Sequence, residues 1–220
     1  MTSVKACIFD LDGVVVDTAI FHYQAWKRLA DELGIKGFTE EENENLKGVS
    51  RQRSLEIILE IGGITFDQMT KDELTEKKNG WYVELISKMT PEDILPGVKH
   101  FFNELQRKGI KLGLASASKN ARRILGRVGI ESYFEAIVDG NRISKAKPSP
   151  EVFLLCAQDL QVDPVDCVVF EDAKAGIEAA KNGGMFSIGV GSSSILGEAD
   201  FVISSFDEMN INRLQFYGTK

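Results

Sequence analysis

Three features are scarce or missing in this sequence of 220 residues, and each absence excludes a class of protein. The only cysteines, Cys7, Cys156 and Cys167, lie far apart in apolar surroundings. Disulfide frameworks and zinc sites need paired spacing, so we expect buried free thiols. No run of about 18 apolar residues exists, so no transmembrane helix is expected. Lys and Arg number 26 against 33 Asp and Glu, and this net charge of −7 argues against a broad nucleic-acid or anionic-membrane surface.

Further absences concern location and chemistry. Asp10 and Asp12 break the apolar start of the chain and no small-residue cleavage site follows, so we expect a reduced, cytoplasmic protein without a signal peptide. The sequence contains no P-loop, no CxxC pair and no GxSxG elbow. Gly189-Val190-Gly191 is only half of a dinucleotide fingerprint, because no acidic partner follows at the expected distance. These motifs therefore predict no nucleotide site.

The composition is typical of a globular protein, and the sequence shows two patterns: one that is only helical and one in which strands and helices alternate. With 43% hydrophobic and 27% charged residues, neither disorder nor a fibrous fold is expected. Between residues 17 and 93 the patterns are only helical, over 21–33, 50–61 and 67–88. After Gly97 strands and helices alternate. The predicted strands are 4–11, 111–115, 136–138, 165–170, 185–190 and 201–203, and the later helices are 98–108, 118–128, 150–160 with Ser149 as N-cap, 173–182 and a short one from Phe206.

This alternation predicts an α/β fold, with a Rossmann-like parallel sheet core and an inserted all-helical cap domain. The first strand cannot form a sheet alone, so it belongs with the later strands. Connections between a strand and the next helix are usually about 2–6 residues long, so the helical insert is a domain of its own. We expect a core domain of residues 1–16 and 94–220, a cap domain of residues 17–93, and hinges near 15–19 and 91–96.

Acidic residues stand at the carboxyl ends of the predicted strands, where open α/β sheets bind ligands. Asp10 and Asp12 follow the first strand, and their spacing points both carboxylates to one side. Such groups repel each other unless a cation or a shared proton intervenes. Glu171-Asp172 ends the fourth strand, and oxygen ligands of this kind suit Mg²⁺. The structural alternative is that Asp12-Gly13 forms a turn and Asp172 caps a helix. The same edge also receives Ser116 and Lys147.

These residues lie in segments that resemble a known family. The stretch FDLDGVVVDT resembles the first motif of the haloacid-dehalogenase superfamily of phosphotransferases. The Ser116 region, Lys147-Pro148 and Glu171-Asp172 resemble its second, third and fourth motifs. The resemblance covers the whole chain, including a helical cap inserted after the first motif. Within the superfamily it is sharpest toward mutases of sugar phosphates, through HYQAWKRLADELGI, LKGVSRQRSLEIIL, LASASKNAR, KPSPEVF and FEDAKAGIEAA.

The resemblance implies roles for the residues of the core. Asp10, ionised at neutral pH, attacks phosphorus and becomes an aspartyl phosphate. Asp12 acts as general acid and then as general base on the sugar oxygens. Lys147 and the Ser116 hydroxyl hold the equatorial oxygens during transfer. Mg²⁺ reduces the repulsion between carboxylate and phosphoryl group, and its implied ligands are Asp10, the carbonyl of Asp12, Glu171 and Asp172.

The resemblance also implies a second phosphate site. Four residues clasp the phosphate that is not transferred: Arg51 from the cap and Ser118, Lys119 and Asn120 from the core. Lys47, Gly48, Ser54 and Lys78 match positions that face the substrate or steer cap closure, Thr18 matches a hinge-side position, Ala117 a substrate contact, and His22 a support for Asp12. Structural alternatives stay open for three of them: a solvated charge for Arg51 and for Lys78, and a packing role for His22.

The function implied is a mutase that interconverts β-D-glucose 1-phosphate and glucose 6-phosphate. The route passes through the aspartyl phosphate and β-glucose 1,6-bisphosphate, which serves as activating intermediate, with Mg²⁺ as cofactor. The alternative is a Mg²⁺-dependent phosphatase of small sugar phosphates on the same scaffold. A non-catalytic regulator is a third possibility, disfavoured by the intact set of Asp10, Asp12, Lys147 and Asp172. The expected partner is a small phosphorylated sugar, with no nucleic acid or membrane, and the expected state is a monomer.

Overall fold

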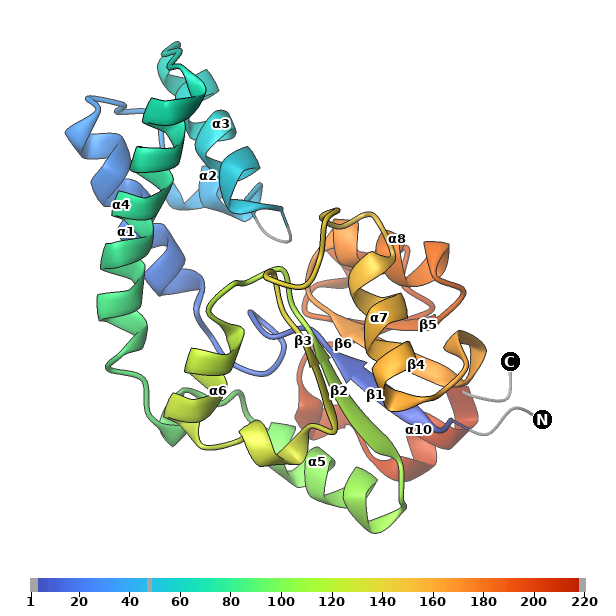
Figure 1. Ribbon diagram of the computed structural model, residues 1–220. Helices are drawn as coiled ribbons and strands as arrows, with labels where there is room; N and C mark the ends of the chain where they lie inside the picture. The colour runs from blue at the N-terminus through green and yellow to red at the C-terminus, as the bar shows by residue number, and fades with distance from the viewer. Residues whose placement is uncertain (1–3, 47–48, 218–220) are drawn as a thin grey trace.

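The computed structural model describes residues 4–46 and 49–217, and six strands form one parallel sheet in the order β3-β2-β1-β4-β5-β6 (Figure 1). The order reverses at β1, because β2 and β3 lie on one side of it and β4 to β6 on the other. This is the doubly wound α/β fold that the sequence predicts. The strands are β1 (Ala6–Phe9), β2 (Lys111–Ala115), β3 (Ala136–Val138), β4 (Cys167–Glu171), β5 (Phe186–Val190) and β6 (Phe201–Ile203).

Helices cover both faces of the sheet. Successive side chains of β1 point to opposite faces, so Cys7 and Phe9 belong to one buried cluster and Ala6 and Ile8 to the other. The first cluster is covered by α5 (Val98–Arg107), α6 (Ala121–Val128) and α10 (Ile211–Tyr217), and the second by α7 (Glu151–Leu160) and α8 (Lys174–Asn182). Phe9 stacks on Phe170 with ring centroids 4.8 Å apart. This packing fixes the two strands from which the acidic side chains emerge.

The remaining long helices form a cap with an apolar core of its own. They are α1 (Ala19–Glu32), α2 (Glu40–Glu44), α3 (Arg51–Gly62) and α4 (Gln68–Ile86), and they stand apart from the sheet in Figure 1. Ser50 caps α3 by accepting a hydrogen bond from the Arg53 N–H. The cap core is built mainly from Trp26, Leu29, Phe38, Leu55, Ile58 and Leu59.

The two chain segments that join cap and core lie against each other. Val16 pairs with Ile94 in an antiparallel bridge, and the Leu95 N–H donates to the Val15 carbonyl at 3.0 Å. The Asp17 N–H likewise donates to the carbonyl of Asp93, in the 3₁₀ turn η1 (Pro91–Asp93). The domain boundaries expected from the sequence, 16/17 and 93/94, stay predictions.

Several local predictions differ from the structure. Ser149 is not the N-cap of α7: Pro150 is, and the helix begins at Glu151. The fourth strand begins at Cys167 rather than at 165, because Pro164 starts a 3₁₀ turn, η3 (Pro164–Asp166). Three short elements were not predicted from the sequence: α2, α9 (Ser193–Leu196) and the 3₁₀ turn η2 (Glu131–Tyr133). The last predicted helix begins at the 3₁₀ turn η4 (Phe206–Glu208), whereas the last helix in the structure is α10.

Cys7, Cys156 and Cys167 are free and buried. Within residues 4–46 and 49–217, no helix has the length and apolar content that crossing a membrane requires.

Candidate active site

The site forms at the carboxyl ends of β1 and β4, the two strands that meet where the sheet order reverses. Phe9 is in register with Phe170, and the Asp10 N–H donates to the Phe170 carbonyl at 3.0 Å. The carboxylate of Asp10 therefore comes out of the sheet beside Glu171. Above these strand ends, a cavity of about 410 Å³ lies between the sheet edge and the cap.

Asp10 and Lys147 form a buried ion pair at the base of this cavity. Asp10 is 6% exposed, and its Oδ1 accepts a hydrogen bond from Lys147 Nζ while Oδ2 accepts the Asp12 N–H at 3.0 Å. Lys147 Nζ also donates to Glu171 Oε2 at 2.8 Å. Burial disfavours the ammonium, but the two carboxylates outweigh it and raise the pKa of Lys147. Lys147 thus stays charged at neutral pH, pointing at the group expected to attack.

Oxygen atoms of Asp10, Glu171 and Asp172 lie within 4.8 Å of one another and fit a divalent cation. Burial, followed by the charges of Asp10 and Asp172, raises the pKa of Glu171, although the Lys147 ammonium acts in the opposite direction. Two glycines permit the crowding. A Cβ at Gly13, where φ is +78°, lies 2.2 Å from Asp172 Oδ2, and one at Gly176 lies 2.0 Å from Glu171 Cδ. The donor set therefore suits Mg²⁺.

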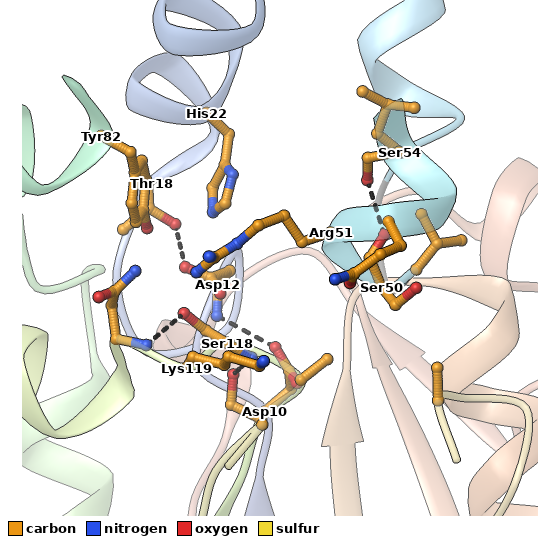
Figure 2. Close-up of a pocket in the computed structure, with 18 of the residues that line it drawn as sticks. Asp10, Asp12, Thr18, His22, Ser50, Arg51, Ser54, Tyr82, Ser118 and Lys119 are labelled. Carbon is orange, nitrogen blue, oxygen red and sulfur yellow. Dashed lines mark hydrogen bonds between the residues drawn. The ribbon is translucent and has the colours of Figure 1, made fainter. Parts of the chain in front are cut away.

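Asp12 faces away from this acid cluster. Its Oδ1 accepts a hydrogen bond from the hydroxyl of Thr18, which is fully buried just before α1 (Figure 2). Burial, followed by the charge of Asp10, raises the pKa of Asp12 to about 6, although Thr18, Lys147 and Lys78 act in the opposite direction. A carboxyl group with this pKa can both hold and release a proton near neutral pH.

Lys78 lies inside the cap rather than on a solvated face, so that alternative is wrong. It is 3% exposed, its Nζ lies 3.1 Å from His22 Nδ1, and it sits 4.4 Å from the Trp26 ring centroid and 4.7 Å from that of Tyr82. Burial, then the charge of Arg51, lowers the pKa of Lys78 to about 7. Burial, Lys78 and Arg51 in turn hold the pKa of His22 well below its usual range.

Arg51, at the start of α3, extends toward the side of the cavity where Asp12 and Thr18 lie (Figure 2). Its side chain is 17% exposed. Nη1 donates to Glu76 Oε1 at 2.6 Å and Nη2 to Asn79 Oδ1 at 2.9 Å. The Arg51 guanidinium is therefore mostly buried and bonded to Glu76 and Asn79, so the alternative of a solvated charge is wrong.

The loop after β2 supplies the core side of the cavity. Ser116 is 1% exposed, and its Oγ accepts the Ser118 N–H at 3.0 Å. The Ser118 Oγ accepts the Asn120 N–H at 3.2 Å. A Cβ at Gly140 lies 2.2 Å from the Ala117 carbonyl oxygen, so the loop after β3 packs closely on this one. These local bonds explain why α6 begins at Ala121 rather than at 118.

The cavity brings together predicted residues from both parts of the chain. Lys147 lies at the base of the site, where it is bonded to Asp10 and Glu171. Lys47 and Gly48 lie outside the described residues. Ser54 faces the cavity but donates its hydroxyl to the Ser50 carbonyl at 3.2 Å. The predicted residues that line the cavity are Asp10, Asp12, Thr18, His22, Arg51, Ser54, Lys78, Ser116, Ala117, Ser118, Lys119, Asn120, Glu171 and Asp172.

Sequence reasoning missed other lining residues. Tyr82 and Asn79 come from α4, and Asn43 comes from α2. Tyr82 is four residues after Lys78, so helical spacing places it on the same face, a signal that could have found it. Asn43 carried no such signal, since α2 itself was missed. The other unpredicted lining residues include Ser50, Gln52, Ile143, Ser144, Lys145 and Ala146.

A doubly wound sheet with an acid cluster at its reversal point, together with an inserted helical cap, is the architecture of a capped α/β enzyme. Residues 4–184 match the family model described as haloacid dehalogenase-like hydrolase. The chain belongs to this family.

The relatives include both mutases and phosphatases. The chain is 47% identical to β-phosphoglucomutase of Bacillus subtilis over 212 residues, covering 96% of this chain and 93% of that protein. It is 35% identical to a phosphorylated carbohydrates phosphatase of Thermotoga maritima, with 82% of each chain covered. The crystal structure of β-phosphoglucomutase from Clostridium difficile superposes with a TM-score of 0.94, at 42% identity, covering 98% of this chain and 97% of that one.

Proposed function

We propose that the protein is a β-phosphoglucomutase, which interconverts β-D-glucose 1-phosphate and glucose 6-phosphate through an aspartyl-phosphate enzyme and β-glucose 1,6-bisphosphate. The observation that carries the proposal is a cavity with a lysine–carboxylate cluster at one end and a guanidinium group at the other. Lys147 is bonded to Asp10 at the strand ends, and Arg51 reaches in from the cap. A bisphosphate needs both ends, because one phosphate reacts while the other is held. The mutase of Bacillus subtilis, at 47% identity, supports the same conclusion.

In this mechanism Asp10 is the nucleophile. Its carboxylate oxygen forms a bond to phosphorus, and the bond from phosphorus to the sugar oxygen breaks. Lys147, held by Asp10 and Glu171, stabilises the charge on the transferring oxygens, and Ser116 adds a hydroxyl donor. Asp10, the carbonyl of Asp12, Glu171 and Asp172 would hold Mg²⁺, which would neutralise charge between the nucleophile and the phosphoryl group.

Asp12 moves the protons. As a general acid it donates one to the sugar oxygen that leaves, and as a general base it takes one from the hydroxyl that attacks the aspartyl phosphate. A pKa raised to about 6 suits both directions. Thr18 holds the carboxyl of Asp12 by a hydrogen bond, and His22 and Lys78, whose nitrogens lie 3.1 Å apart, line the same cavity.

Asp12 needs the sugar hydroxyl rather than water as its partner, so the cap must exclude water while the phosphate is on Asp10. The remaining substrate contacts proposed are Lys47, Gly48, Ser54, Ala117, Ser118, Lys119 and Asn120. The cytoplasmic location and the monomeric state expected from the sequence stay predictions.

A phosphatase of small sugar phosphates is the second candidate, favoured by the 35% identity to the Thermotoga maritima phosphatase. The deciding experiment supplies the purified protein with α- or β-glucose 1-phosphate, with and without added β-glucose 1,6-bisphosphate. Glucose 6-phosphate and inorganic phosphate are measured separately. We expect glucose 6-phosphate from the β anomer only, faster with bisphosphate. Inorganic phosphate as the main product establishes the phosphatase instead.

The same assay tests the metal. Chelation with EDTA is expected to silence the reaction, and Mg²⁺ to restore it, because the acid cluster repels a phosphate when no cation compensates it. Undiminished turnover after chelation contradicts the assignment of Asp10, Glu171 and Asp172 as metal ligands.

A further inference from the structure

One side chain joins the two parts of the molecule at the cap end of the cavity. Asn79, on α4, lines the cavity and is half-buried. Its Oδ1 accepts a hydrogen bond from Nη2 of Arg51 on α3 at 2.9 Å, and another from Nδ2 of Asn120 ahead of α6 at 3.0 Å. A single amide oxygen therefore holds one donor from the cap and one from the core.

Both of these donors keep capacity for a ligand. An arginine has five N–H donors and a primary amide has two. The contacts of Arg51 with Glu76 and Asn79 use one hydrogen on each of two nitrogens, and Asn120 uses one hydrogen of its amide. An incoming phosphate thus needs to break neither contact with Asn79. It meets two donors that already converge.

We propose that Asn79 is a positioning residue, which holds Arg51 and Asn120 together so that the non-transferring phosphate of a sugar phosphate binds to a prearranged pair. The inference rests on the proposed function, because it takes Arg51 and Asn120 as ligands of that phosphate. A long arginine side chain loses rotamer freedom when it binds, and ordering it beforehand removes that loss from the binding step. The Asn79 bridge also fixes the distance between cap and core at this end of the cavity.

The exposed partner of Arg51 cannot serve this purpose. The side chain of Glu76 is 70% exposed, and an ion pair with one such partner is screened by water. Glu76 also contacts the cap side only, whereas Asn79 reaches a donor of the core. Of the two partners of Arg51, only Asn79 therefore links the guanidinium to the core domain.

The test is the affinity for glucose 6-phosphate, measured by calorimetry on the full chain with Mg²⁺ present. Asn79→Ala is expected to weaken this affinity by about tenfold. Gln68→Ala is the matched control, because it removes an exposed amide from the start of the same helix and is expected to change nothing. Thermal unfolding checks that each variant is folded. If Asn79→Ala is not, Asn79→Leu keeps the volume and removes the oxygen.

A double-mutant cycle separates positioning from a general structural role. In an Arg51→Ala background, Asn79→Ala is expected to weaken binding by less than about twofold, since the pair of donors that Asn79 holds together is already broken. A tenfold loss in that background as well overturns the proposal, as does unchanged affinity of the single variant. Tighter binding also overturns it, because Asn79 then competes with the phosphate.

The isomerisation assay of the wild-type chain reports on the proposed function by itself. A chain that does not isomerise, yet loses affinity through Asn79→Ala as described, refutes the mutase and leaves the positioning role standing. A chain that isomerises while Asn79→Ala binds glucose 6-phosphate normally refutes the positioning role only.

Discussion

The two walls of the cavity are built differently. On the core wall, Asp10, Lys147 and Glu171 are 6%, 5% and 1% exposed, and they pair with one another at the ends of adjacent strands. On the cap wall, Arg51 stands at a helix start and pairs with Glu76, which is 70% exposed. Breaking a buried pair costs about 3–5 kcal/mol, whereas an exposed pair contributes about 0–1 kcal/mol. The ion pairs of the core wall are therefore held more firmly than the ion pair of the cap wall.

This difference separates two tasks. Bond making needs groups fixed within a fraction of an ångström, which strand ends and buried pairs provide. Gripping and releasing a substrate needs contacts that exchange with water, which helix-borne side chains provide. We therefore expect substitutions on the core wall to reduce turnover for every substrate, and substitutions on the cap wall to reduce it selectively.

The largest effect is expected for Asp10→Asn, which removes the proposed nucleophile while nearly keeping the side chain's shape. Turnover is expected to fall by at least about 10³-fold for sugar phosphates and for acetyl phosphate alike. Rates are measured by coupled assay and by phosphate release, with circular dichroism as the check on folding. Substantial activity in this variant removes the aspartyl-phosphate mechanism.

Asp12→Asn separates nucleophilic attack from proton transfer within the core wall. The nucleophile stays, so transfer from a bisphosphate continues slowly, but proton transfer to and from the sugar oxygens is lost. Isomerisation is expected to fall by roughly 10²- to 10⁴-fold. Single-turnover transfer from β-glucose 1,6-bisphosphate serves as the internal control. An isomerisation rate equal to that of the wild type takes Asp12 out of the acid–base role.

Arg51→Ala tests the cap wall. Loss of a charge-assisted contact with phosphate costs on the order of 2–5 kcal/mol, so isomerisation of glucose 1-phosphate is expected to fall by about 10²-fold or more. Acetyl phosphate has no second phosphate, and its hydrolysis is expected to fall by less than about threefold. Arg51→Lys restores only part of the loss, because an ammonium lacks the planar fork. Equal losses in both reactions contradict the proposed contact.

The last effect concerns stability rather than rate. Burial lowers the pKa of Lys78 from 10.5 to about 7, so between these values the folded protein binds fewer protons than the unfolded chain. The contribution of Lys78 to stability therefore rises with pH across this window, by up to about 1.4 kcal/mol per pH unit. Urea unfolding at several pH values is expected to show this slope in the wild type and its loss in Lys78→Met. If the wild type and Lys78→Met show the same change of stability with pH, the pKa of Lys78 is not lowered by burial.

Much of the core wall follows from sequence, because strand ends in a parallel sheet converge by topology. The strands 111–115, 136–138 and 201–203 have the predicted bounds, since buried β-branched and aliphatic runs end at polar residues. The shift of the fourth strand matters for the site. Glu171 is the last residue of β4 rather than the first of a loop, which buries its carboxylate and forces it toward Lys147.

The cap wall was less accessible to sequence reasoning. Helix α2 has the sequence EEENE, which shows no apolar periodicity, and only the Thr39 side chain marks its start. Lys78 stands in a charged run, and its burial depends on Trp26 and Tyr82 from two different helices. The bridge from Asn79 to Asn120 joins residues 41 positions apart, across two parts of the chain. Such pairings depend on tertiary contacts that local patterns do not encode.

The pairing of the two crossing segments has a consequence for how such proteins diversify. Because Val16 and Ile94 are neighbours, the chain returns to the α/β domain almost where it left. The entropy of closing a loop grows only slowly with its length, so the sheet is nearly indifferent to what lies between these points. The insert can therefore vary in length with little effect on the stability of the sheet. An insert of different length or sequence is compatible with the same sheet, whose strand ends carry Asp10, Glu171 and Asp172.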